Sequence, residues 1–69
     1  MESETEVRVL HRAQDAAQRI MKDNELCLTQ YPLIIDGKVV DSGEALRERQ
    51  HNLRRLSALL NERLVGLAQ

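Results

Sequence analysis

Leucine recurs through the last third of the chain with the spacing of one helix face. The stripe comprises Leu46, Leu53, Leu56, Leu60, Leu64 and Leu67, at intervals of seven, three, four, four and three residues. Because intervals of three and four bring side chains to the same side of an α-helix, the stripe predicts a helix over residues 43–67 that packs against another helix. Asp41 and Glu44, three residues apart, give this segment the acidic start typical of a capped N-terminus.

An apolar arc predicts a second helix over residues 4–26. The arc comprises Val9, Leu10, Ala13, Ala17, Ile20 and Met21, with charged and polar residues on the other side. Ser3 and Glu6 have the spacing of a capping box at its start. Asn24 is either a polar group that sets the register of a helix interface or a C-terminal cap. Cys27 is expected to be a small buried residue.

The connector, residues 27–42, has a different pattern. Two β-branched runs surround Asp36 and Gly37, which predicts a β-hairpin with a type I′ turn; an irregular apolar loop is the alternative. Pro32 restricts the first strand to an edge or a starting position. Since an isolated two-stranded hairpin is marginally stable in water, we expect it to lie on the helices or to pair with a second copy or a partner.

These elements predict a single, mainly α domain over residues 1–69. The expected architecture is an antiparallel helical hairpin with a short β-hairpin or extended connector, packed as a homodimeric four-helix arrangement. Self-association is expected because a chain of 69 residues buries little apolar surface, and one cysteine provides no internal disulfide. The predicted core and dimer residues are Leu10, Ala13, Ala17, Ile20, Met21, Leu46, Leu53, Leu56, Leu60 and Leu64.

Charge and composition predict the compartment and exclude some partners. No apolar run is long enough for a membrane span, and the acidic N-terminus is unlike a secretory signal. The single cysteine suits a reducing compartment, so we expect a cytoplasmic protein. A net charge of -1 does not favour nucleic-acid binding, and the connector is too long for a helix-turn-helix motif.

Two groups of residues are candidates for binding a larger protein. Arg47, His51, Arg54 and Arg55 share one side of the second predicted helix. They form either a patch for an acidic surface or for phosphates, or an ordinary solvated face. Tyr31, Leu33, Ile34 and Ile35 form a candidate apolar docking patch, with Tyr31 as its main contact. The alternative for Tyr31 is a ring packed between the connector and a helix.

No catalytic, cofactor-binding or metal-binding set is expected, and we predict that the chain is not an enzyme. The sequence contains no phosphate loop or serine nucleophile motif. Residues 46–49 and 59–64 are similar to the first helix of the all-helical chorismate mutases, which makes a mutase a remote alternative. In that family the helix opens the chain, whereas here it closes it, and the other active-site groups have no counterpart.

The whole layout, with the segment from Pro32 to Val40 between a capped helix and an arginine-rich leucine helix, resembles small early phage proteins that inhibit host regulators. In size and layout it is most similar to the phage quorum-sensing anti-activators. The resemblance implies a homodimer that binds the DNA-binding domain of a LuxR-type transcription activator, with a pilus-assembly ATPase as a second target. A small nucleic-acid-binding regulator that uses the arginines of the second helix is the alternative.

Overall fold

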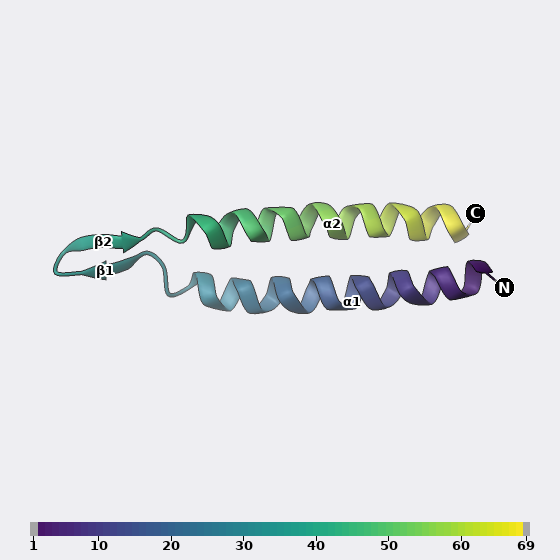
Figure 1. Cartoon of the computed structure of the whole chain (residues 1–69), viewed down its shortest axis with the longest axis horizontal. Coiled ribbons are helices and arrows are strands. Elements are labelled where there is room, and N and C mark those ends of the chain that lie inside the picture. The colour runs from purple at the N-terminus through teal and green to yellow at the C-terminus, as the bar shows by residue number, and fades with distance from the viewer. Residues whose placement is uncertain (1, 69) are drawn as a thin grey trace.

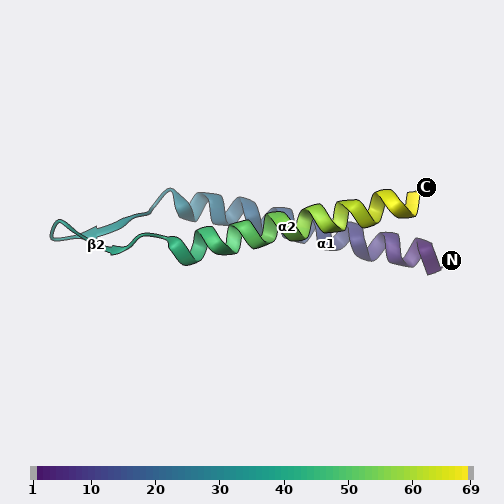
Figure 2. The ribbon, with the colours of Figure 1, turned by 90° about the horizontal axis from the view of Figure 1, so that it is seen from above.

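The computed structural model describes residues 2–68, with side chains from residue 4 onward. Helices α1 (Glu2–Leu28) and α2 (Glu44–Ala68) run antiparallel, and strands β1 (Leu33–Ile35) and β2 (Lys38–Asp41) form a hairpin between them (Figure 1). The molecule is a rod of 59 × 14 × 13 Å, with both ends of the chain at the end remote from the strands (Figure 2). The predicted helical hairpin with a β-hairpin connector is therefore confirmed. Neither of these two helices is long and apolar enough to cross a membrane.

The two helices meet along a seven-residue repeat, which we call the seam. On α1 the seam positions, all buried or half-buried, are Val7, Leu10, Gln14, Ala17, Met21, Asn24 and Leu28. On α2 they are Leu46, Gln50, Leu53, Ser57, Leu60, Leu64 and Leu67. Alternating intervals of three and four over seven residues are the pattern of a coiled coil, so the fold is a two-helix antiparallel coiled coil closed by a β-hairpin.

Two contacts between the helices fix their register. The Gln50 side-chain amide donates a 2.9 Å hydrogen bond to the backbone carbonyl of Met21. Near the chain ends, the Arg63 guanidinium forms an ion pair with Glu6 at 2.8 Å. Each step of seven residues forward on α1 therefore meets a step of seven residues back on α2.

Three amides lie in this seam. Gln50 is 3% exposed, and Asn24 is also buried. Among the residues described, Gln14 Oε1, Asn24 Nδ2 and Gln50 Oε1 are buried without a hydrogen-bond partner. Because an unpaired polar atom in a dry seam costs free energy, these amides make the helix pair less stable than an all-leucine seam would. Asn24 lies four residues before the end of α1, which makes it an interface residue rather than a cap.

Two of the predicted core and dimer residues lie outside the contact between the two helices. Ile20 and Leu56 are 38% and 46% exposed, and neither belongs to the seam. Two helices without further neighbours contact each other through two positions in every seven residues. The seam positions Leu53 and Leu60 are separated by steps of four and three residues, so the position between them is Ser57 and not Leu56. Ala13 is half-buried at the edge of the seam. The other predicted core residues, Leu10, Ala17, Met21, Leu46, Leu53, Leu60 and Leu64, do lie in the seam.

The β-hairpin extends beyond the helices instead of lying on them. Its turn has positive φ at Asp36 (52°) and Gly37 (76°), as the predicted type I′ turn requires. Ile34 pairs with Val39 and Ile35 with Lys38, and a register shift follows Leu33. All residues of both strands are exposed. Of the alternatives expected for the strands, packing on the helices is excluded, because the helices end before the strands begin (Figure 1). Pairing with a second copy or a partner stays a prediction.

Two hydrogen bonds connect the end of the hairpin to the start of α2. The Gly43 amide donates a 2.8 Å hydrogen bond to Asp41 Oδ1, and the Arg47 amide donates to the Gly43 carbonyl at 3.0 Å. Asp41 thus shapes the approach to the helix, as its sequence position indicated, although its partner is Gly43 rather than the first turn. At the start of α1 the helix begins before Ser3, whose side chain lies outside the described part.

The backbone conformation of Gly43 and the space around it both require glycine, which gives a first prediction. Its φ is 82°, and an added Cβ would lie 2.8 Å from Tyr31 Cγ. We expect Gly43→Ala to lower the free energy of unfolding by about 2 kcal/mol, measured by urea denaturation. Gly66→Ala is the matched control, because Gly66 is helical with open space around it; that variant should gain about 0.5 kcal/mol. Equal effects of the two substitutions would contradict the assignment.

The buried amide of Asn24 gives a second prediction. Asn24→Leu removes an unpaired polar atom from the seam and replaces it with an apolar side chain of similar size. We expect the free energy of unfolding to rise by about 1 kcal/mol, measured by thermal and urea denaturation. A loss of stability would show that the Asn24 amide has a stabilising partner.

Candidate protein-interaction surfaces

The hairpin carries a cluster of exposed apolar side chains, which we call the tip. It comprises Leu33, Ile34, Ile35, Val39 and Val40. The last four are each between 59% and 62% exposed. A cluster of β-branched side chains at the end of a rod has the composition of a protein-contact site rather than of a solvated turn. Val39 and Val40 were not among the residues predicted to bind a partner, although their place after the Asp36–Gly37 turn was a usable signal.

Tyr31 lies at the base of the tip and is only half-buried. Its ring packs close to Gly43, which supports the alternative of a packed ring rather than a free contact residue. Tyr31 also lines, with Asp41 and Arg49 among others, a shallow hollow of about 240 Å³ at the junction. The structure therefore gives Tyr31 a role in holding the tip on the helices.

Arg47, His51, Arg54 and Arg55, which we call the arginine face, are all exposed on α2. None of them takes part in a side-chain ion pair or hydrogen bond that we identify with another described residue of the chain. Their charges are therefore available for contact with an acidic surface or with phosphates.

A third surface combines both helices, and we call it the apolar flank. It comprises Val9, Ala13, Ala16 and Ile20 of α1 with Leu56 and Leu59 of α2. Ala13 and Ile20 follow Glu6 by seven and fourteen residues, and Leu56 precedes Arg63 by seven. Since Glu6 and Arg63 contact each other, these side chains lie on that same side of the helix pair. Ile20 and Leu56 were among the predicted core and dimer residues, whereas Leu59 was not.

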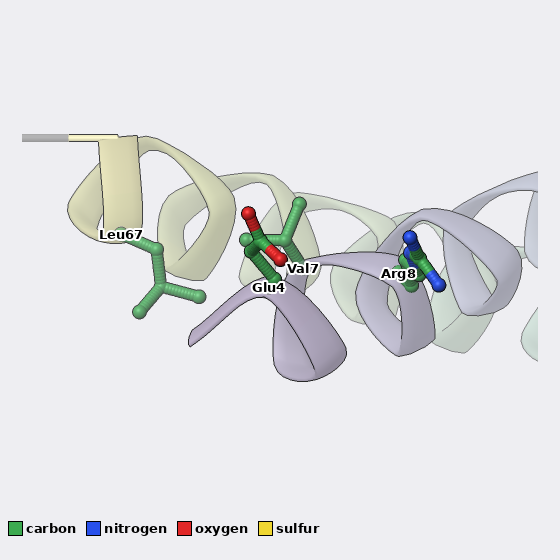
Figure 3. A pocket seen from close by; sticks show the side chains of 4 residues that line it. All are labelled: Glu4, Val7, Arg8 and Leu67. Atoms are coloured by element: carbon green, nitrogen blue, oxygen red, sulfur yellow. The ribbon is translucent and has the colours of Figure 1, made fainter. Parts of the chain in front are cut away.

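A further surface lies at the end of the rod that is remote from the strands. Glu4, Val7, Arg8 and Leu67 line a shallow depression of about 340 Å³ in which Glu4 and Leu67 lie on different helices (Figure 3). Glu4 is exposed, while Glu6 is already paired with Arg63. The acidic N-terminal stretch therefore presents less free charge than its sequence implied, and the side chain of Glu2 lies outside the described residues.

Cys27 is exposed, so the expectation of a small buried residue is wrong. It follows Ile20 by seven residues and thus continues the apolar flank towards the tip. In the described part of the chain, no three histidine, cysteine, aspartate or glutamate side chains gather as a metal site.

Comparison with protein-family models, with curated proteins and with solved structures gives no match to this chain.

Proposed function

We propose that the chain is a non-enzymatic, homodimeric protein that binds a larger cytoplasmic protein through the tip and occludes part of its surface. The observation that carries this proposal is that every residue of both strands is exposed, including five large apolar side chains. Two short strands without a covering layer gain little stability from each other. Their apolar side chains are better explained by an intermolecular contact than by the stability of the single chain.

The tip suits a concave, apolar site on the partner. The backbone of the rod spans only 14 × 13 Å across its length, so its end is narrow enough to enter a groove between the elements of another domain. A protein held by its end blocks the groove while the helices cover the neighbouring surface. This is the action of an inhibitor or adaptor.

The arginine face supports contact with an acidic rim beside that groove. Exposed arginines such as Arg47 and Arg54 speed the encounter with an acidic surface and select among partners more than they add affinity. We therefore assign the affinity to the tip and the selectivity to the arginine face.

The partner class that we propose to test first is the DNA-binding domain of a LuxR-type transcription activator, with a pilus-assembly ATPase as a second target. This choice follows the resemblance in layout to phage anti-activators. A chain bound to such a domain would compete with operator DNA for it, and the result would be loss of activation.

The tip gives a third prediction. We expect the double variant Ile34→Ser/Val39→Ser, which changes one cross-strand pair, to bind a purified LuxR-type DNA-binding domain at least tenfold more weakly. Leu26→Ser is the matched control, because Leu26 is equally exposed on α1 but lies outside the tip. Titration calorimetry measures both affinities, and circular dichroism checks that helix content is unchanged. Equal affinities of the two variants would contradict docking through the tip.

A small nucleic-acid-binding regulator is the second candidate, and the exposed arginine face is the observation in its favour. This alternative predicts that the chain shifts duplex DNA by itself, with binding that weakens steeply as salt concentration rises. Protein binding through the tip predicts no shift of DNA alone, and an affinity for the partner protein that changes less steeply with salt concentration than phosphate binding does.

A further inference from the structure

The apolar flank lies outside the tip and the arginine face, and nothing in the single chain covers it. Its four largest side chains, Val9, Ile20, Leu56 and Leu59, are between 38% and 60% exposed. Glu6 and Arg63 border it on the side of the chain ends, and Asp23 and Arg49 border it on the side of the tip. Such a surface, apolar in the centre and charged at both edges, has the anatomy of a helix-bundle interface.

We propose that a second copy of this chain covers the flank, with the symmetry axis along the rod, so that both tips lie at the same end. The inference deepens the proposed function, since the homodimer proposed there would then offer its partner a doubled tip. Two identical faces can pack about a two-fold axis along the rod or about an axis across it. The two choices bring different residues together.

Charge complementarity selects the axis along the rod. In that arrangement α1 of one copy lies on α2 of the other at the same level. The register then sets Glu6 against Arg63 of the second copy and Asp23 against Arg49 of the second copy. With the axis across the rod, each helix lies on its own counterpart, reversed about the centre of the flank. Glu6 then meets Asp23 and Arg63 meets Arg49, so like charges face each other at both edges.

Side-chain volume selects the same arrangement. The centre of the flank has two alanines, Ala13 and Ala16, on α1 and two leucines, Leu56 and Leu59, at the same level on α2. When α1 lies on α2 of the second copy, leucine meets alanine, and large residues fill the space that small residues leave. In the other arrangement alanine lies on alanine and leaves a void beside a crowded pair of leucines.

The consequence for function is a composite binding site. Two tips at one end of a four-helix bundle present two symmetric copies of the Ile34–Val39 pair to one partner. A partner with two matching grooves, or one long groove, would then be held by both, which raises the apparent affinity without any new kind of contact. In the alternative dimer the tips point away from each other, and each would bind alone.

Cys27, the only cysteine of the chain, is a natural reporter of the arrangement because it is exposed on the flank near the tip. The full chain, spin-labelled at Cys27, is measured by pulsed electron paramagnetic resonance without any partner. We expect a label-to-label distance of roughly 20 Å, the width of a helix bundle with its side chains. An axis across the rod moves the two labels about 40 Å apart, at 1.5 Å rise per residue. That longer distance, or the absence of a dipolar signal, overturns the inference.

Reversing the charge of Asp23 gives an independent test, because the two arrangements predict opposite changes in the strength of dimerisation. With both tips at one end, Asp23→Arg sets arginine against Arg49 in two places and should weaken dimerisation about tenfold, measured by sedimentation equilibrium. With tips at opposite ends, the new arginine would face Glu6 and strengthen it. Asp15→Arg is the matched control, because Asp15 and Asp23 are each four residues from Arg19 but Asp15 lies outside the flank. Dimerisation that is unchanged or strengthened by Asp23→Arg relative to this control overturns the inference.

These tests use the chain alone, so they are separate from the proposed binding of a larger protein. A same-end dimer that binds no activator domain would overturn the proposed target and leave the dimer standing. An activator domain bound by a chain with widely separated labels would do the reverse.

Discussion

The contact between two helices without a third is narrow, and most features of this protein follow from that constraint. Two positions in seven meet across the seam, so a 69-residue chain with long helices has more apolar residues than the seam can bury. Three amides occupy seam positions and lower its stability further. The surplus apolar side chains gather on one side, from Val9 to Leu59, and form a face that suits another helix pair.

The connector holds a second group of exposed apolar side chains, those of the two strands. The Asp36–Gly37 turn and the packing of Tyr31 on Gly43 fix the position of two strands that are exposed along their whole length. A tight turn and a constrained glycine hold the apolar tip away from the helices. In this position the tip adds little to the stability of a monomer. Together, the tip and the apolar flank support the proposal that this protein dimerises and binds a larger protein.

Much of this fold could be predicted from the sequence, because helical periodicity and the Asp-Gly turn are local signals. Both helices, the hairpin and the turn type were predicted, and helix bounds differed by one or two residues. The choice between Leu56 and Ser57 for the seam was not predictable from hydrophobicity, since it depends on having one neighbouring helix instead of several. The exposure of Cys27 and the projection of the strands beyond the helices depend equally on tertiary packing. Of the candidate site, the arginines were identified because charged side chains stay exposed whatever the packing, and Ile34 and Ile35 because they belong to the apolar run before the Asp36–Gly37 turn. The flank required the register of the two helices.

Small-angle X-ray scattering on the chain alone is the measurement that we would make first, since it gives mass and length together. For a dimer with both tips at one end we expect a particle of twice the 7.9 kDa chain mass, whose longest dimension stays close to the 59 Å of one rod. A dimer with tips at opposite ends would reach about 80 Å, because the centre of the flank lies nearer the chain ends than the tip, at 1.5 Å rise per residue. A particle of that length, or one with the mass of a single chain, would show that the two tips do not lie together.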